Sequence, residues 1–102
     1  MAGFVVDKEQ KSVLAKLDGQ IFPEEVRLLK AELLEYFRQG YHQFTLDMAD
    51  VEYIDASLLG TLAFMNHLVR AEQGKIGVIN LRRGPKELFI VTKFDCYIIN
   101  EK

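Results

Sequence analysis

The sequence predicts an α/β domain in which three helices pack against a mixed sheet of five short strands. Segments with the two-residue alternation of a strand take turns along the chain with segments that have the spacing of a helix. Two strand-like segments come first with no helix between them, which indicates an antiparallel hairpin, whereas strands joined through helices are expected to pair in parallel. With 102 residues, 49% of them apolar and 27% charged, the chain has the size and composition of a single domain spanning residues 1–102.

The N-terminal part of the chain is predicted to form the hairpin and the first helix. Residues 3–9 are short and β-branched, and residues 12–19 alternate in polarity, so we expect these two strands to pair. Pro23 stands where a helix favours its first residue, and two glutamates follow it. Apolar residues then recur at helical spacing until Gly40, so a helix is expected over residues 23–39.

The rest of the chain alternates between strands and helices. Residues 56–72 are apolar on almost every side, so they are predicted to form the most buried helix, and a shorter helix is expected over residues 85–93. Strands are predicted at residues 42–48, 75–81 and 96–100. The predicted sheet therefore has an antiparallel first pair and largely parallel strands after it.

Composition excludes several classes of function. A net charge of −2 gives no electrostatic reason to expect nucleic acid or an anionic membrane as a partner. No segment approaches the roughly 20 apolar residues of a bilayer span, and the first residues do not resemble a signal peptide, so a cytoplasmic protein is expected. The single cysteine, Cys96, excludes an internal disulfide, and its apolar neighbours predict a buried core position.

The sequence contains no pattern typical of an enzyme. His42 and His67 lack further ligands at metal spacing, so structural roles and no metal are expected. The glycines form no dinucleotide or phosphate loop and no serine stands in a nucleophile elbow, so neither a cofactor nor catalysis is expected. Asp47 would suit a phospho-accepting receiver domain, but the acidic pair that such domains need on the first strand is missing. We therefore expect Asp47 to be an ordinary polar residue at the sheet edge.

The informative polar residues stand just before the long apolar helix. Asp55 is a favoured N-cap residue, whose carboxylate accepts a backbone N–H two or three residues further on. Ala56 and Ser57 would then begin the helix, where the first N–H groups have no intrahelical partner and attract anions. A phosphate on Ser57 would suit this position and would make the surface beside Asp55 strongly negative. From these residues alone, a covalent switch and a plain helix cap both remain open.

The stretch LDMADVEYIDASLLGTLAFM, residues 46–65, resembles the motif region of the STAS family, the domain shared by sulfate transporters and anti-sigma factor antagonists. The order of elements and the turn KLDGQI resemble that family as well. The resemblance implies that Asp55 is the motif aspartate and that Ser57 is the serine phosphorylated in bacterial antagonists. Ala56 stands at the first serine of the motif, and Leu58 replaces its glycine.

The resemblance also implies a partner-binding surface around Ser57, made of Gln20, Phe22, Asp55, Ala56, Leu58, Leu59 and Gly60. Phe22 and Leu58 replace a polar and a small residue of the family pattern. The apolar side chains of Phe22, Leu58 and Leu59 are therefore expected to include some that stay partly exposed. A weak homodimer could occupy the same patch.

Together, the residues and the resemblance predict an anti-sigma factor antagonist. It would bind an anti-sigma factor of the serine protein kinase type and free a sigma factor for transcription. Phosphorylation of Ser57 would break the complex and a phosphatase would restore it. The alternative is a constitutive STAS interaction subunit of a lipid-transport ATPase or a stress-signalling assembly, without phosphorylation, which Leu58 favours.

Overall fold

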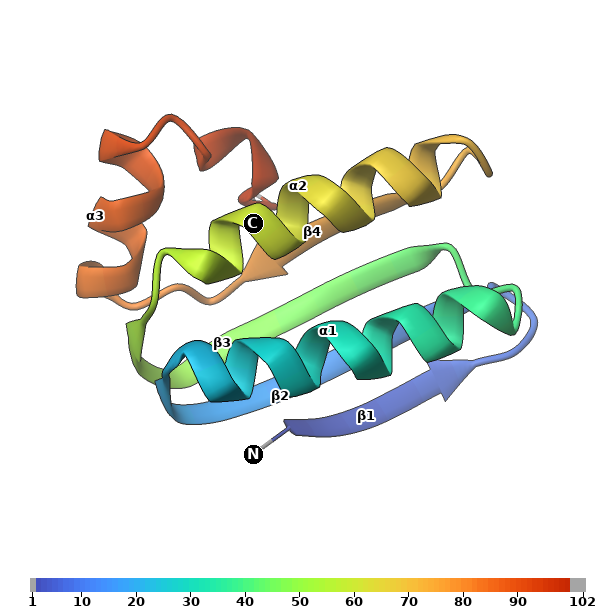
Figure 1. Ribbon diagram of the computed structural model, residues 1–102, viewed down its shortest axis with the longest axis horizontal. Helices are drawn as coiled ribbons and strands as arrows, with labels where there is room; N and C mark the ends of the chain where they lie inside the picture. The colour runs from blue at the N-terminus through green and yellow to red at the C-terminus, as the bar shows by residue number, and fades with distance from the viewer. Residues whose placement is uncertain (1, 100–102) are drawn as a thin grey trace.

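The computed structural model describes residues 2–99, and within them it confirms the α/β class with a mixed sheet (Figure 1). Strands β1 (Ala2–Asp7) and β2 (Ser12–Ile21) form the predicted antiparallel hairpin. Strands β3 (Gln43–Ile54) and β4 (Lys75–Ile79) are added in parallel, which gives the order β1-β2-β3-β4. The sheet of the described residues thus has four strands, where five were predicted.

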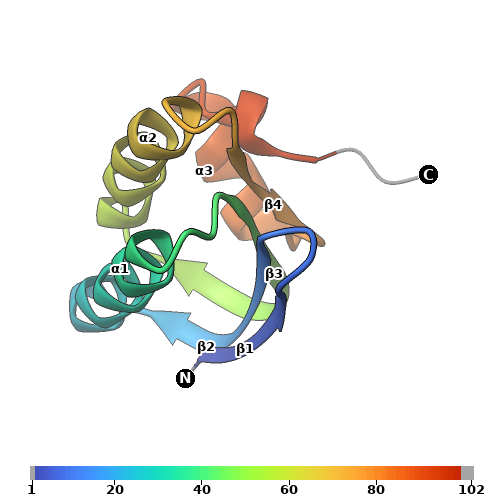
Figure 2. The same ribbon diagram turned by 90° about the vertical axis from the view of Figure 1, so that its right-hand side faces the viewer.

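Two helices cover one face of this sheet. Helix α1 (Pro23–Arg38) and helix α2 (Ser57–Arg70) pack against each other, and Figure 2 shows them side by side on the same side of the strands. Helix α3 (Arg83–Val91) contacts β3 and lies at the end of the molecule where α2 begins (Figure 1). The three predicted helices are confirmed, with boundaries shifted by at most two residues.

The core lies between the sheet and the pair α1 and α2. The alternation seen in the sequence places every second side chain of the inner strands on the helix-covered face, as expected for a half-buried sheet. Fully or almost fully buried members of this layer are Val13, Ala15, Leu17, Phe44, Leu46, Met48, Ile76 and Val78. Helix α2 contributes more buried residues than α1, in agreement with its almost continuous apolar sequence.

Strand β3 continues well beyond the predicted end at residue 48. Val51 and Ile54 are buried, and the strand stays paired with β2 through two shifts in register. Gly19, with φ of +80°, lies at the second shift in a conformation that glycine adopts most easily. As a result Gln20 pairs with Tyr53, and both strands finish at the same edge of the sheet. This edge is where α1 and α2 begin.

The prediction of a fifth strand at residues 96–100 is wrong within the described residues, and the last residue of that range lies outside them. Lys93 adopts a φ of +65°, so α3 ends in a left-handed turn. The chain then forms a short 3₁₀ helix, Asp95–Tyr97, and only Ile98 makes a parallel bridge to Val78 of β4.

The 3₁₀ helix also explains why a second expectation fails. Cys96 was predicted to be a buried core residue because its neighbours are apolar. In the structure Cys96 belongs to the short 3₁₀ helix and is exposed. The rings of Phe94 and Tyr97 instead supply the apolar contacts of this segment, with centroids 5.6 Å apart.

Candidate functional site at the start of helix α2

The predicted site residues gather at the edge where β2 and β3 end. The two strand ends are held together by a hydrogen bond of 2.8 Å from the N–H of Asp55 to the carbonyl of Ile21. Helix α1 begins two residues after Ile21, and helix α2 begins two residues after Asp55. The parallel pairing therefore brings Phe22 and Ser57, which are far apart in the sequence, to the same end of the molecule.

Phe22 is presented to solvent by its place in front of α1. It is the N-cap residue, its carbonyl accepts the first helical hydrogen bond from Val26, and Pro23 follows it as predicted. The Glu25 carboxylate accepts the N–H of Phe22 at 3.0 Å, which satisfies a donor that the helix leaves free. With its backbone fixed this way, the Phe22 side chain stays outside the core and is 47% exposed.

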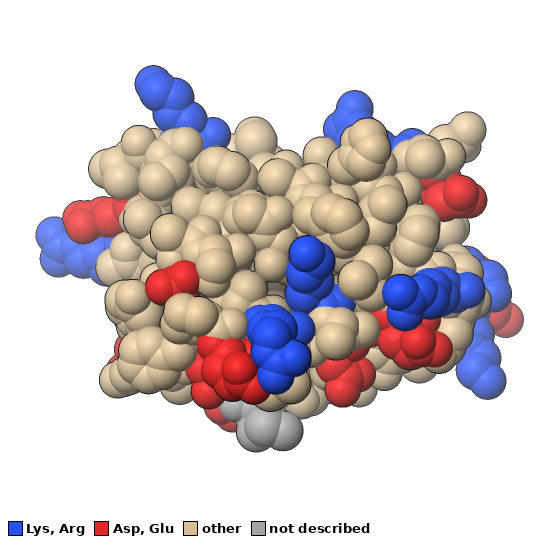
Figure 3. Space-filling view, viewed as in Figure 1, with Lys and Arg blue, Asp and Glu red and all other residues tan. Residues whose placement is uncertain are grey.

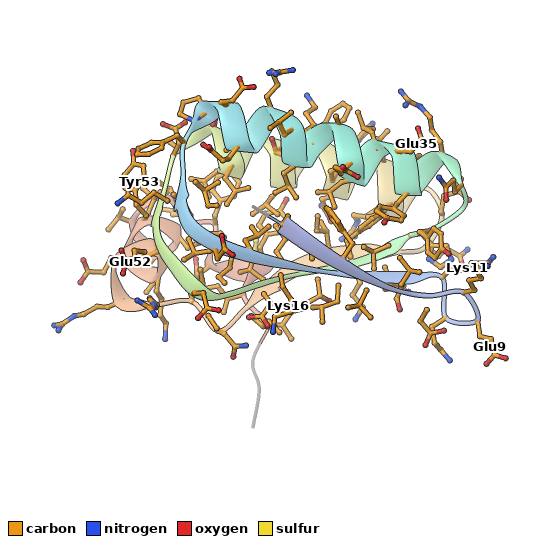
Figure 4. The ribbon with its side chains drawn as sticks, turned by 90° about the horizontal axis from the view of Figure 1, so that it is seen from below. Glu9, Lys11, Lys16, Glu35, Glu52 and Tyr53 are labelled. Atoms are coloured by element: carbon orange, nitrogen blue, oxygen red, sulfur yellow. The ribbon has the colours of Figure 1, made fainter. Side chains whose placement is uncertain are left out.

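Tyr53 accompanies Phe22 and was not singled out from the sequence. Its ring centroid lies 5.5 Å from that of Phe22 with the planes inclined at 45°, and its side chain is 46% exposed. Figure 4 shows Tyr53 and Glu52 at one end of the sheet, with Glu35 and Lys11 at the other. The sequence did contain a signal for its exposure. Neighbouring side chains of a strand point to opposite faces, so a buried Ile54 predicts that Tyr53 faces away from the core. We call Phe22 and Tyr53 the aromatic pair.

The hydrogen bond predicted for Asp55 is confirmed, although the N-cap position itself falls on Ala56. The Asp55 carboxylate accepts the N–H of Ser57 at 2.9 Å, and the helix begins at Ser57, one residue later than predicted. Hydrogen bonding from the Ser57 hydroxyl, and then from its N–H, holds the pKa of Asp55 below the ordinary value of 3.8. Asp55 is therefore ionised at neutral pH.

The first N–H groups of α2 are not free to bind an anion, which corrects the expectation from sequence. The N–H of Ser57 is taken by the Asp55 carboxylate, and the N–H of Leu58 donates to the Asp55 carbonyl at 2.9 Å. The N–H of Leu59 donates to the Ala56 carbonyl, also at 2.9 Å. A tight first turn satisfies these donors. A phosphate on Ser57 would thus meet a carboxylate and not a set of vacant N–H groups.

The predicted partner-binding residues divide into two groups. Ser57 is exposed, and so are Gln20, Phe22, Ala56 and Gly60, while Asp55 is partly exposed. By contrast, Leu58 is fully buried and Leu59 is 5% exposed. Of the three apolar side chains expected to include exposed ones, only Phe22 is exposed. Leu58 points into the core and does not crowd the hydroxyl of Ser57 from the surface.

Asp47 is a buried residue of β3, so the prediction of an ordinary polar residue at the sheet edge is wrong. It is 9% exposed, and its carboxylate accepts the side-chain N–H of Asn80 at 3.0 Å and the backbone N–H of Ala49 at 3.1 Å. Lys16, on the sheet face away from α1 in Figure 4, lies 3.8 Å from the same carboxylate. The Asn80 hydrogen bond is the main cause that lowers the pKa of Asp47; Ala49 and Lys16 add to it, and burial opposes them.

Arg82 connects α3 to the same end of the molecule. Its Nε donates to the carbonyl of Ala49 at 2.9 Å, and its Nη1 lies 3.6 Å from the Glu52 carboxylate. Arg82 is the N-cap residue of α3, so these contacts place the start of that helix beside the end of β3. Sequence reasoning did not find this contact because the partners are some thirty residues apart.

The described residues show no arrangement for metal chemistry. Within residues 2–99, no group of three or more His, Cys, Asp and Glu side chains could hold a metal ion. His67 is exposed, and His42 is partly buried with an Nδ1 atom that has no hydrogen-bond partner among those residues. None of the helices in this part of the chain combines the length and the apolar character that crossing a membrane requires.

Comparison with protein families identifies the class to which this fold and site belong. The family model described as "Mlab, STAS domain" matches residues 4–99, so the chain belongs to the STAS domain family. No curated protein sequence matches the chain.

Solved structures agree with this assignment. The anti-sigma factor antagonist SpoIIAA in its unphosphorylated form is similar with a TM-score of 0.90 and 14% identity, over 100% of this chain and 89% of that chain. The Bacillus cell fate determinant SpoIIAA in the phosphorylated form gives 0.79 and 14%, over 100% and 92% of the two chains. A Thermotoga maritima protein described as an anti-sigma factor antagonist gives 0.83 and 18%, over 96% and 83%. At these identities the likeness establishes a shared fold.

Proposed function

We propose that this protein is an anti-sigma factor antagonist, which binds an anti-sigma factor of the serine protein kinase type and is released from it by phosphorylation of Ser57. Binding would free a sigma factor for transcription, and a phosphatase would return the protein to its binding state. The protein would act in the cytoplasm by association and not by catalysis.

The observation that carries this proposal is the position of Ser57. Its side chain is exposed in the first turn of α2, at the edge where the aromatic pair and the start of α1 also reach the surface. Aromatic side chains with about half of their surface exposed are typical anchors of protein interfaces. A kinase that docks on the aromatic pair would have the Ser57 hydroxyl within the same contact area.

The charge of this surface explains how phosphorylation would reverse binding. A phosphoserine adds a charge of about −1.5 to −2 near neutral pH. Asp55 is already ionised there and holds the N–H of Ser57, so the new charge would face a carboxylate at close range. A partner would have to remove both charges from water, and this cost together with the repulsion disfavours docking. The fold itself would remain, because Ser57 is a surface residue.

Phosphorylation itself can be tested directly. Incubation with a serine kinase of the anti-sigma type and ATP, followed by mass spectrometry, should place one phosphate on Ser57. The chain has only one other serine, so Ser12→Ala is the matched control and should be modified as the natural protein is. Modification of Ser57→Ala to the same extent would contradict the assignment.

A second candidate is a constitutive STAS interaction subunit, of a lipid-transport ATPase or a stress-signalling assembly. The description of the matching family favours it, since that description names Mlab and not an antagonist. The aromatic pair would serve such an interface without any phosphate. Leu58 does not help to distinguish this candidate from an antagonist, because its side chain is buried and does not contribute to the surface around Ser57. Binding of a partner that is unaffected by charge at Ser57 would distinguish this candidate.

A further inference from the structure

A groove lies between β1 and α1, and none of the predicted partner-binding residues around Ser57 is among those that line it. Its volume is about 440 Å³, and apolar side chains from the sheet and the helix line it, among them Phe4, Leu17 and Leu28. Leu28 is 50% exposed, although it projects from a helix whose neighbouring Leu29 is buried. The groove therefore presents apolar surface that the domain itself leaves uncovered.

The strand beside this groove has a free edge. Strand β1 pairs with β2 only, so its outer row of backbone N–H and C=O groups has no strand partner in the described sheet. Natural edge strands are commonly protected by lysine, proline or a bulge. The segment Ala2–Asp7 contains neither residue and pairs with β2 in unbroken register, and its Val5 is 60% exposed. This edge can therefore accept another strand.

The helical wall of the groove is acidic. Glu25, Glu32 and Glu35 line the groove from α1, and Figure 3 shows red side chains along the lower part of this view with blue ones among them. Of the basic residues of α1, Lys30 lies 4.3 Å from the centre of the Phe64 ring on α2, and Arg27 pairs with Glu24. Arg38 lies 3.6 Å from the Glu35 carboxylate in an exposed pair, so it offsets part of the charge at that glutamate. An occupant of the groove would therefore meet apolar side chains below and carboxylates above.

We propose that an extended segment of a partner protein, with alternating apolar and basic side chains on one face, binds this groove as an additional strand beside β1. Backbone hydrogen bonds to β1 would supply affinity, and the side chains directed towards α1 would supply selectivity. Valine- or leucine-sized groups would fill the groove, and arginine or lysine would extend along it and place the charge near Glu32 and Glu35. This surface is separate from the Ser57 site, so the proposal does not depend on the proposed function.

Charge argues against a second copy of this chain as the occupant. Two copies paired through β1 would bring the same three glutamates of each α1 to one interface, and the only charged residue that Ala2–Asp7 contributes is an aspartate. Like charges facing each other in an interface are unfavourable. A basic partner segment has the opposite sign.

A capped seven-residue peptide, valine-threonine-arginine-threonine-valine-threonine-arginine, is a suitable probe, because its valines and arginines share one face when extended. Titration into the ¹⁵N-labelled protein should shift amide resonances of β1 and α1. Two further forms carry N-methyl groups on alternate residues. Strand addition uses only alternate N–H groups of the added strand, so one methylated form should fail to bind and the other should bind.

Charge reversal in the protein provides the matched controls. Glu32→Lys combined with Glu35→Lys should weaken binding of this peptide by about tenfold, since it replaces attraction by repulsion at the rim. Glu72→Lys combined with Glu87→Lys makes the same charge change at exposed positions elsewhere and should leave binding unchanged. Ser57→Ala should also have no effect, which separates this result from any failure of the proposed function.

Three results would overturn the proposal. One is the absence of shifts at β1 and α1 at millimolar peptide, and another is equal binding of a peptide in which glutamate replaces arginine. The third is a homodimer through β1 in analytical ultracentrifugation, which would make a second copy the occupant. Far-UV circular dichroism of each variant confirms that the changes at these exposed positions leave the fold intact.

Discussion

Asp47 is the residue whose surroundings differ most from its sequence prediction. Asp47 is only 9% exposed, so its carboxylate requires partners. It has three: the backbone N–H of Ala49, the Lys16 side chain on β2, and the Asn80 side chain in the loop after β4. Asn80 in that loop has a φ of +61°, a conformation that asparagine tolerates better than most residues. Asp47 and Asn80 thus connect β3 to the path of the chain leaving β4.

We expect Asp47→Ala to lower the free energy of unfolding by about 1–3 kcal/mol, because it removes the hydrogen bonds that Asn80 and Ala49 donate to a buried, ionised carboxylate. The pKa of Asp47 is lowered in the folded state, so its contribution is present above the ordinary value of 3.8 and is lost as the pH falls through the folded-state value. Urea unfolding between pH 6 and pH 2 measures this. The difference in free energy of unfolding between the natural protein and Asp47→Ala should become smaller towards pH 2. A difference that stays constant over this pH range would show that the charge of Asp47 is not involved.

Phe22 tests the aromatic pair as a binding surface. Phe22→Ser should leave the fold intact, because serine is a favoured N-cap residue and the phenylalanine ring is 47% exposed. The same substitution should weaken binding of the anti-sigma factor at least about tenfold, as truncation of an aromatic anchor does. Phe64→Ser is the control, because Phe64 is also exposed (39%) but lies in α2, outside the aromatic pair. Calorimetric titration of the anti-sigma factor into each variant measures the two affinities. Equal losses for both variants would argue against a specific role of Phe22.

At the scale of elements, the connection between α2 and β4 depends on Gly74. Its N–H donates to the carbonyl of Val69 at 2.8 Å and ends the helix, and a Cβ atom at this position would overlap the carbonyl oxygen of His42. That carbonyl accepts the N–H of Lys75, which begins the pairing of β4 with β3. The close approach of two backbones therefore requires glycine here.

Gly74→Ala should accordingly destabilise the protein by about 2 kcal/mol or more, since backbone on both sides must move. Gly60→Ala is the matched control, because it lies within α2 and a Cβ there has no atom within 4 Å. The control should gain up to about 1 kcal/mol from the better helix propensity of alanine. Thermal unfolding of the two variants gives the comparison. Equal midpoints would show that the segment around His42 can adapt.

Elements with local signals were predictable from the sequence. The hairpin followed from alternation, and α1 followed from Pro23, its first-turn glutamates and Gly40. The extension of β3 and the short 3₁₀ helix after α3 were not predictable, because both depend on distant contacts. β3 continues since β2 pairs with it across two register shifts, and Ile99 packs against Gly77, where a Cβ would lie 2.7 Å from its side chain.

At the scale of the whole molecule, the candidate site was predictable in part. Asp55 and Ser57 stand out in the sequence, and the structure shows the predicted hydrogen bond between them and an exposed Ser57, although α2 begins one residue later than predicted. Leu58 and Leu59 were assigned to the partner-binding surface from the motif alone. In the structure both lie on the side of α2 that faces the core. Tyr53 was missed, because its contact with Phe22 exists only once β2 and β3 end at the same edge.

The aromatic pair and the groove beside β1 are two exposed apolar surfaces that share no residue. The aromatic pair lies at the end of the sheet, and the groove beside β1 follows the length of α1 towards Glu35, which Figure 4 shows at the opposite end from Tyr53. Helix α1 contributes to both, through Phe22 at its start and Leu28 on its flank. A partner on one surface therefore leaves most of the other accessible.

The proposed switch at Ser57 is tested most directly by isothermal titration calorimetry, which compares the affinity of an anti-sigma factor for Ser57→Ala and Ser57→Asp. Both variants should unfold within about 0.5 kcal/mol of the natural protein, as surface substitutions usually do. We expect Ser57→Ala to bind as tightly as the unmodified protein, and Ser57→Asp, with a second charge beside Asp55, to bind at least about tenfold more weakly. Equal affinity of the two variants for the anti-sigma factor would contradict a switch at Ser57.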